Sequence, residues 1–356
     1  MGDILDYLAW RGDLSLEQAP FGPVDALALA AASYIHFDDL IPGGPEAPVP
    51  LGRTAERYLA LPPSRRGRSR GEKDLALFRA LADSPRFAGM GLCRYADTFL
   101  PEEETQFSAL AVLLGDGSAF LAFRGTDATL VGWKEDFNMC FLDVVPAQLE
   151  AASYIGDFAR RFPGPLVLGG HSKGGNLAVA GASLCPVKVR DRIKTVYSFD
   201  GPGFTDYLLA RPGYQELLTR IRTFVPQSSV VGLLLGHEEP HTVIRSDQEG
   251  LFQHDPYSWQ VLGPDFVQVE DIDSGSRRID RALKTWLAGL TKRQRETVVD
   301  TLYDLLSSGD AKMVRDALEP QHLAAALHAA LGLPPRDLLT LASSLAGLAG
   351  ALLLAV

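Results

Sequence analysis

Residues 166–175 read LVLGGHSKGG, and this stretch decides the fold. A short apolar run suits a strand buried in a parallel sheet, and the alanine-rich residues 176–184 that follow are compatible with a helix. Between them, Gly170-His171-Ser172-Lys173-Gly174 has the Gly-x-Ser-x-Gly pattern of a nucleophile elbow, in which both glycines remove Cβ atoms from a tight turn. We therefore predict that Ser172 is an activated nucleophile. The alternative is a glycine-rich loop that only connects a strand to a helix.

Strand-like and helix-like segments alternate on both sides of this turn. Two apolar runs flank Gly115-Asp116-Gly117 and predict a hairpin, and residues 146–161 follow a helical pattern. Three further runs have strand character: KTVYSF (194–199), IRTFVP (221–226) and HTVIRS (241–246). Strands that alternate with helices predict an α/β fold, a mostly parallel sheet with helices on both faces.

Both ends of the chain add segments to this core. The first forty residues have a helical pattern, residues 42–71 form a connection rich in Pro, Gly and Arg that we expect to be exposed, and the pattern is helical throughout from about Ser276. We thus expect an N-terminal helical extension and connection over 1–75, an α/β core over 76–275 and a C-terminal helical extension over 276–356.

Composition excludes some classes of function. The 356 residues include 44 acidic and 34 basic side chains, and a formal charge of −10 argues against nucleic acid as the main partner. Cys93, Cys140 and Cys185 form neither a disulfide framework nor a zinc-ligand pattern, which indicates buried thiols in a reducing compartment. The first residues lack the basic and apolar regions of a secretory signal, so a cytoplasmic location is expected. We expect no metal and no organic cofactor, because no cluster of residues has ligand spacing.

The last nineteen residues leave two interpretations open. Residues 338–356 contain no charged side chain, and the run is just long enough to span a membrane. The alternative is an Ala/Leu/Gly-rich helix that packs on the domain, since no basic flank anchors the run. Membrane association through this segment is therefore an expectation that the sequence alone does not test.

A second motif suits the stabilisation of an oxyanion. Residues 123–127 read FRGTD and follow an apolar strand. Acyl transfer needs two aimed N–H donors for the developing negative charge, one from the residue after the nucleophile and one from an earlier strand-to-helix loop. Lys173 occupies the first position, and Gly125-Thr126 supplies a loop at a plausible place for the second. Alternatively, Arg124 and Asp127 only tie this loop together.

Together these motifs resemble the class 3 (fungal-type) lipases. The resemblance rests on Phe-Arg-Gly-Thr with a downstream Trp133 and Asp136, and on Gly-His-Ser-x-Gly-Gly, and it covers about residues 105–260. Residues 3–35, FDGPGF and QHDPYSWQ are similar to a largely uncharacterised bacterial branch of that family. The resemblance implies an α/β-hydrolase fold with a triad in the order Ser, Asp, His. It also implies Ser172 as nucleophile, Thr126 and Lys173 at the oxyanion-hole positions, and a lipid or lysophospholipid ester as substrate.

His254 is the expected base. Of the histidines that lie in the core beyond the elbow, His237, His241 and His254, only His254 follows the last strand-like run, in a loop where a triad histidine belongs. An exposed loop histidine without catalytic function is the alternative.

The expected acid departs from the family pattern. In class 3 lipases it follows the strand that aligns with residues 222–226, but here Gln227-Ser228-Ser229 stands at that place. Asp200, directly after the strand 194–199, is the best replacement. Asp247 and Asp255 are weaker candidates, and a dyad without an acid is a further alternative.

Two questions about function stay open at this level. The Lys173 side chain either favours an anionic or polar acyl substrate or is simply solvated. The preferred function is a serine hydrolase that cleaves a carboxylic ester through an acyl-serine intermediate. A thioesterase or peptidase with the same triad is one rival. The other is a non-catalytic hydrolase-fold binding module that keeps Ser172 but has lost the acid.

Overall fold

A sheet of eight strands forms the centre of the protein, whose computed structural model describes residues 1–41, 47–66, 71–317 and 319–355. The strands lie side by side in chain order, antiparallel from β1 to β4 and parallel from β4 to β8. Their bounds are β1 Val49–Pro50, β2 Gly91–Leu100, β3 Thr105–Leu113, β4 Ala119–Phe123, β5 Leu166–His171, β6 Ile193–Phe199, β7 Ile221–Pro226 and β8 His241–Ile244. All five residues of β4 are buried, as expected for a strand covered on both faces.

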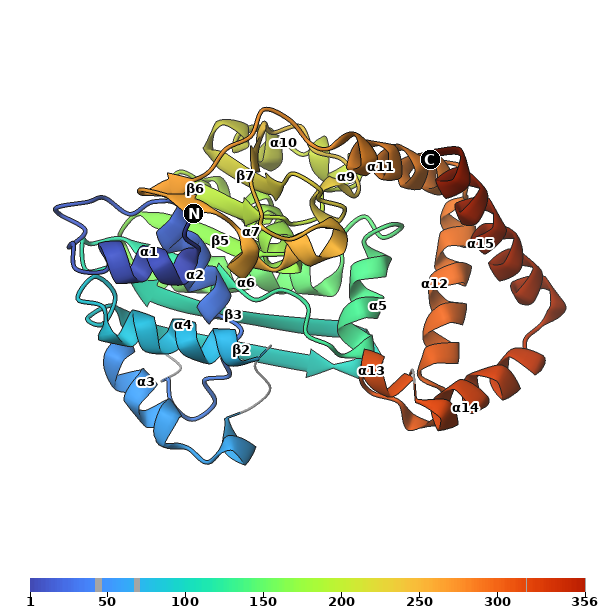
Figure 1. Ribbon diagram of the computed structural model, residues 1–356, viewed down its shortest axis with the longest axis horizontal. Coiled ribbons are helices and arrows are strands. Elements are labelled where there is room, and N and C mark those ends of the chain that lie inside the picture. Colours follow the sequence, from blue (N-terminus) through green and yellow to red (C-terminus); the bar gives the residue numbers. More distant parts are fainter. Residues whose placement is uncertain (42–46, 67–70, 318, 356) are drawn as a thin grey trace.

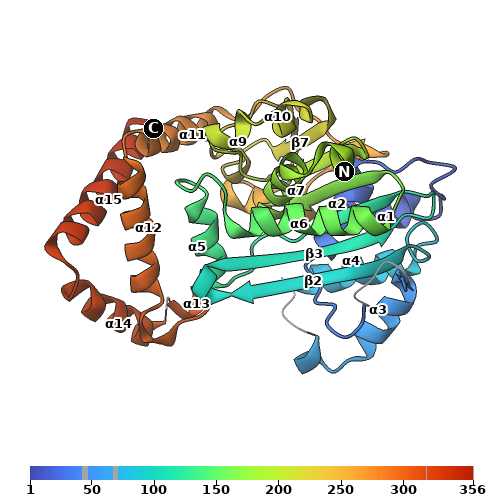
Figure 2. The same cartoon turned by 180° about the vertical axis from the view of Figure 1, so that it is seen from behind.

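Helices cover both faces of the sheet (Figures 1 and 2). The N-terminal helices pack on one face: α1 Ile4–Arg11, α2 Pro23–Ala32, α3 Leu51–Ala60 and α4 Glu72–Asp83. The other face carries α6 Pro146–Arg161, α7 Lys173–Leu184, α8 Val187–Arg190, α9 Asp206–Leu209 and α10 Pro212–Gln215. The predicted α/β-hydrolase fold is thereby confirmed, including the hairpin around residues 115–117, which joins β3 and β4.

The register of the sheet aligns the ends of its parallel strands. Phe123 of β4 pairs with Gly170 of β5, His171 pairs with Phe199 of β6, and Phe199 pairs with Phe224 of β7. Residues that follow these strands therefore meet at one edge of the sheet, where open α/β sheets place their ligands. The FRGT loop, Ser172, Asp200 and residues 227–229 come together at this edge.

The N-terminal segment is more closely integrated than its sequence suggests. Side chains of α2 are almost entirely buried and share one hydrophobic cluster with the sheet. The expectation of an exposed connection over 42–71 is wrong for 51–60, because α3 buries Leu51, Ala55 and Tyr58. Residues 42–46 and 67–70 of that connection lie outside the described residues. The strand β2 also had no predicted counterpart, since its alternation is weak.

The C-terminal extension is helical, as expected, and extends beyond α5 Leu130–Asn138 (Figure 1). It comprises α11 Ser274–Ala288, α12 Lys292–Leu306, α13 Val314–Ala317, α14 Pro320–Leu331 and α15 Pro335–Ala355. The Thr291 hydroxyl caps α12 together with Gln294, the capping box that the sequence indicates. The exact domain boundaries at residues 75 and 275 stay a proposal.

The apolar C-terminal run forms α15, which packs on other helices. Leu341 and Ser344 are buried, and the Trp286 indole of α11 donates a hydrogen bond to the Ser344 carbonyl oxygen at 2.8 Å. Within the described ranges, no helix combines the length and the apolar character needed to cross a membrane. The described part of α15 packs on α11 and α12.

Candidate active site

Ser172 stands on a strained turn between β5 and α7. Its backbone has φ 60° and ψ −133°, a combination that is costly for a residue with a side chain and that occurs in nucleophile elbows. The Ser172 N–H donates to the Phe199 carbonyl oxygen at 2.9 Å, which fixes the turn against β6. Gly174 is required because a Cβ there would lie 2.1 Å from the Phe123 carbonyl oxygen. Ser172 itself is half-buried, so a substrate can reach it.

His254 and Asp200 form a direct pair. The Nδ1 of His254 lies 2.7 Å from Oδ2 of Asp200, although 54 positions separate the two residues. Asp200 is 1% exposed, whereas the His254 side chain keeps 28% of its surface accessible. With Nδ1 turned to the carboxylate, Nε2 is the ring nitrogen left to exchange a proton with a substrate or a hydroxyl.

Asp200 is itself held from the far side. Its Oδ1 accepts hydrogen bonds from the Ser229 hydroxyl at 2.5 Å and from the Gly232 N–H at 3.1 Å. Both donors follow β7, at the place where the family pattern predicts the acid. Sequence reasoning missed them, because a serine and a glycine carry no signal without the acid they contact.

The other candidate acids lie elsewhere. Asp255 pairs through Oδ2 with the Lys73 ammonium at 3.2 Å, and its Oδ1 accepts the Tyr257 N–H. In the described part of the chain, neither Asp247 nor Asp255 forms a hydrogen bond with His254.

His171, next to the nucleophile, connects the elbow to the base. Its Nδ1 lies 3.2 Å from the Tyr34 hydroxyl, and its Nε2 lies 2.7 Å from the carbonyl oxygen of His254. The two imidazole rings are 4.6 Å apart between centroids. The loop that carries His254 is thus attached to the residue before Ser172, which places the base beside the elbow.

His237 has a carboxylate partner of its own. Its Nδ1 lies 2.9 Å from Glu239 Oε1, and Glu239 also accepts from the hydroxyls of Thr223 and Tyr214. These hydrogen bonds hold the pKa of the Glu239 carboxyl at about 2 despite its burial. His237–Glu239 is thus a second histidine–carboxylate pair of the core beyond the elbow, but it is His254 whose backbone contacts His171, the residue beside Ser172.

The FRGT loop passes directly against the elbow. A Cβ on Gly125 would lie 2.6 Å from the His171 carbonyl oxygen and 3.2 Å from Cβ of Ser172, so glycine permits this close approach. The half-buried Thr126 donates its hydroxyl to Asp136 Oδ2 at 2.5 Å. Burial raises the pKa of the Asp136 carboxyl to about 6, against the opposing effects of Lys173 and Thr126.

The flanking charges of this loop serve separate contacts. Arg124 pairs with Asp97 of β2 at 2.6 Å, and Asp127 accepts from the N–H and hydroxyl of Thr129. Asp127 therefore orders the start of α5, while Arg124 attaches the loop to β2.

Both expectations for the Lys173 side chain are wrong. Lys173 is 1% exposed, and its ammonium lies 2.9 Å from Glu135 Oε2 in the interior. It is neither solvated nor available to a substrate. Its backbone remains a candidate oxyanion donor, because Lys173 begins α7 and the first N–H groups of a helix have no acceptor within it.

A cavity of about 540 Å³ opens beside His254, within the size range of small-molecule sites. His171, His254 and Tyr257 line it together with the highly exposed Leu251 and Phe252. Charged residues complete the lining: Glu72, Lys73, Asp74 and Asp255. The combination of apolar and charged walls suits an amphipathic ligand.

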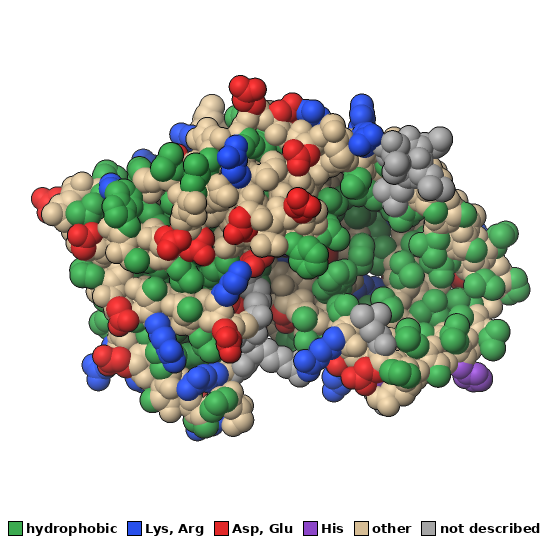
Figure 3. All heavy atoms as spheres, in the orientation of Figure 1, with side chains coloured by type: hydrophobic (Ala, Val, Ile, Leu, Met, Phe, Trp, Pro, Cys, Tyr) green, Lys and Arg blue, Asp and Glu red, His purple; other side chains and the backbone are tan. Residues whose placement is uncertain are grey.

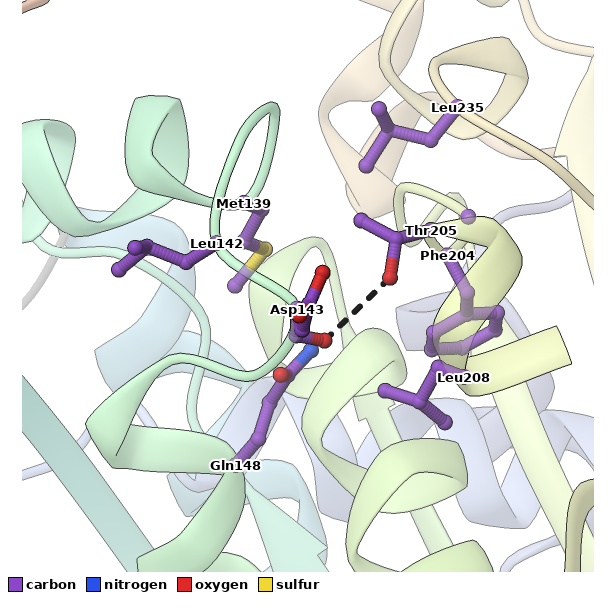
Figure 4. A pocket seen from close by; sticks show the side chains of 9 residues that line it. Met139, Leu142, Asp143, Gln148, Phe204, Thr205, Leu208 and Leu235 are labelled. Atoms are coloured by element: carbon purple, nitrogen blue, oxygen red, sulfur yellow. Dashed lines mark hydrogen bonds between the residues drawn. The ribbon is translucent and has the colours of Figure 1, made fainter. Parts of the chain in front are cut away.

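A much smaller pocket lies between the end of α5 and α9 (Figure 4). Met139, Leu142, Phe204 and Leu208 are among its lining residues, and the volume of about 10 Å³ is at the lower limit for holding one water molecule. An ester does not fit into this volume, so this pocket is not a substrate site.

One group of metal-ligating residues occurs among the described residues. The ligand atoms of His36, Asp38 and Asp97 lie within 4.8 Å of one another. Asp97, however, already accepts from Arg124, at 2.6 Å and 3.2 Å, and from the Tyr95 hydroxyl at 2.8 Å. A cation there would have to displace the guanidinium, so the group does not fit a resident metal.

Fold and site geometry together define a lipase-like protein of the α/β-hydrolase class. Residues 81–304 match the Mbeg1-like family, and the chain belongs to that family. The comparison with curated proteins found no match.

Several solved lipase structures are similar to the chain at low identity. The M37 lipase is 15% identical, with a TM-score of 0.39 over 59% of this chain and 69% of its own. The lipase from Rhizopus microsporus var. chinensis is 12% identical, with a TM-score of 0.38 over 65% and 81%. The Lip2 lipase from Yarrowia lipolytica is 13% identical, with a TM-score of 0.34 over 62% and 93%.

Proposed function

We propose that this protein is a serine hydrolase that cleaves a carboxylic ester through an acyl-serine intermediate. The observation that carries the proposal is the 2.7 Å contact between His254 and Asp200 beside a strained nucleophile elbow. A serine hydroxyl is a poor nucleophile until a base takes its proton, and this pair supplies an oriented base.

The proposed reaction assigns one task to each residue. Ser172 Oγ attacks the ester carbonyl carbon while His254 Nε2 takes the hydroxyl proton, and Asp200 stabilises the imidazolium that forms. The N–H groups of Thr126 and Lys173 donate to the oxyanion. His254 then protonates the departing alcohol. Water, activated by the same histidine, releases the carboxylic acid from the serine.

The binding-module alternative drew its support from the absent carboxylate at residues 227–229. That support is weaker now, because Asp200 contacts His254 and Ser229 contacts Asp200. A fluorophosphonate probe, which reacts only with an activated serine, separates the two functions. We expect the wild type to be labelled and Ser172→Ala to lose labelling and up to about a millionfold of its ester turnover. An unlabelled, folded wild type would support the binding module.

For the substrate we propose an amphipathic ester, such as a lipid or lysophospholipid ester. The supporting observation is the cavity beside His254, in which Leu251 and Phe252 lie close to charged walls. Turnover should be compared among p-nitrophenyl esters of increasing chain length, an acyl thioester and a peptide substrate. Preference for the thioester or the peptide would favour the thioesterase or peptidase alternative.

We also propose that the C-terminal helices associate with a lipid surface without spanning it. Leu327 and Leu331 of α14 and Leu339 of α15 are at least 69% exposed, and Figure 3 shows hydrophobic side chains gathered over these helices. Flotation with neutral phosphatidylcholine vesicles tests this proposal. The variant Leu327→Ser/Leu331→Ser should float less than the wild type, and equal flotation would contradict it.

A further inference from the structure

The interior beneath the elbow contains a complete ion pair. The ammonium of Lys173 lies 2.9 Å from Glu135 Oε2, 2.9 Å from the Gln106 carbonyl oxygen and 2.7 Å from Gln106 Oε1. The Lys173 side chain is 1% exposed and that of Glu135 is 0% exposed. An ammonium has three donors, and all three have acceptors here.

Glu135 is fixed by backbone groups as well as by Lys173. Its Oε1 accepts from the Ala147 N–H at 3.0 Å, and its Oε2 accepts from the Gln106 N–H at 3.1 Å. Gln106 belongs to β3 and Ala147 to α6, so the carboxylate is anchored to two rigid elements. Through Glu135, these elements determine where the Lys173 side chain lies.

A buried ion pair gives little net stability, because the cost of desolvation offsets the attraction. Well-packed apolar side chains of similar volume stabilise a fold as well or better. The benefit of the pair must therefore be sought in the geometry that it enforces. Each partner is connected to one proposed oxyanion-hole donor. Lys173 carries one donor itself, and Glu135 lies in α5, which contacts the loop that carries the other.

On one side, Lys173 carries one of these donors on its own backbone, directly after Ser172. On the other side, Asp136 follows Glu135 in α5 and accepts a hydrogen bond from the Thr126 hydroxyl at 2.5 Å. The backbone N–H of Thr126 is the second proposed donor. The pair thus links the elbow to α5, and α5 links to the FRGT loop. Donors of an oxyanion hole work only when their positions are fixed before the reaction.

We propose that the Glu135–Lys173 ion pair is a positioning device that holds the N–H groups of Thr126 and Lys173 at the separation an oxyanion requires, an inference that rests on the proposed function. Neither side chain touches the substrate. Loss of the pair lets α5 and the elbow shift relative to each other, which weakens binding of the transition state more than binding of the ester.

The test compares Glu135→Gln and the double variant Glu135→Gln/Lys173→Met with the wild type. Complete loss of an oxyanion donor costs about 10²–10³ in kcat, so misplacement of the donors should lower kcat by at least about tenfold. The KM for a p-nitrophenyl ester should change by less than about twofold, because the interaction is made only in the transition state. The double variant leaves no unpaired buried charge, so it keeps the test valid if Glu135→Gln folds poorly. Each rate is divided by the folded fraction.

Asp25→Asn is the matched control. Asp25 forms an equally buried pair with Arg86, at 2.6 Å and with 0% and 1% exposure, among the N-terminal helices. Its loss should lower the melting temperature and leave kcat unchanged. A similar fall of kcat in this control would show that general destabilisation explains the result, and would overturn the inference.

The remaining outcomes separate the two proposals. A labelled, active wild type with full kcat in the folded double variant overturns the positioning device and leaves the serine hydrolase intact. A rise of KM that matches the loss of kcat/KM would assign the pair to substrate binding and also overturn it. A wild type that neither labels nor hydrolyses esters overturns the proposed function, and the positioning device with it.

Discussion

The Ser229 hydroxyl donates a hydrogen bond to Oδ1 of Asp200 at 2.5 Å. Residues 227–229, which lack the carboxylate expected there, thus hold the carboxylate of Asp200 in place. Asp200 sits at the end of β6 with φ 51°, and its other oxygen faces His254. Because β6 and β7 are neighbours in register, an acid from the end of one strand reaches the same histidine as an acid from the other. Asp200 therefore lies at the same edge of the sheet as residues 227–229, which follow β7.

Replacing Asp200 by Asn should strongly reduce activity. The amide keeps the shape but loses the charge and favours the wrong histidine tautomer, so kcat should fall by up to about ten-thousandfold while folding stays nearly intact. Ser229→Ala removes one hydrogen bond to the carboxylate and should cost about tenfold. Steady-state kinetics with a p-nitrophenyl ester measure both. A larger loss for Ser229→Ala than for Asp200→Asn would contradict the assignment.

The pairs His254–Asp200 and His237–Glu239 should differ in their effect on catalysis. His254→Ala removes the base, and we expect kcat to fall by several orders of magnitude. His237→Ala removes a structural partner of Glu239 and should lower the free energy of unfolding by about 1–3 kcal/mol at an unchanged kcat. Kinetics and urea unfolding of both variants provide the comparison. Equal loss of kcat would mean that both histidines are structural.

A methyl group at Gly232 should disturb the triad without touching His254 or Ser172. A Cβ there would lie 2.2 Å from Asp200 Oδ1, so the carboxylate must move. Since small misplacements of reacting groups cost up to about 10²-fold, Gly232→Ala should lower kcat by about tenfold or more. Gly156→Ala in α6, where a Cβ meets nothing within 4 Å, is the control and should keep full activity. Full activity of Gly232→Ala would show that Asp200 need not hold its position.

Asp136 should make stability depend on pH in an unusual direction. Burial raises the pKa of its carboxyl to about 6, above the ordinary value near 4. Between these two pH values the folded chain binds more protons at this group than the unfolded chain does. The free energy of unfolding should therefore fall as the pH rises through this window, by roughly 2–3 kcal/mol relative to Asp136→Asn. Urea unfolding of both proteins between pH 4 and pH 7 measures this difference. If their free energies of unfolding change with pH in the same way, the prediction is refuted.

Local signals of the sequence were sufficient for the elbow and for most of the sheet. The Gly-x-Ser-x-Gly pattern is short-range chemistry: a tight turn needs glycines at fixed positions, and the flanking runs identify the strand and the helix. Helix α6 begins and ends where its pattern predicts, at Pro146 and Arg161. The weakly alternating β2 and the buried helix α3 were missed, since their burial depends on partners distant in the chain.

The burial and contacts of side chains whose partners are distant in the sequence were decided only by the tertiary structure. Lys173 has no local feature that predicts burial, and Glu135, which accounts for it, lies 38 positions earlier. Similarly, Ser229 and Gly232 gain their importance only because β6 and β7 lie side by side. The sequence by itself determined the fold class and the place of the candidate nucleophile, because both follow from patterns a few residues long. Which carboxylate meets His254, and what surrounds Lys173, depended on strand register and on helix packing across the sheet, and these bring together residues that have no relation along the chain.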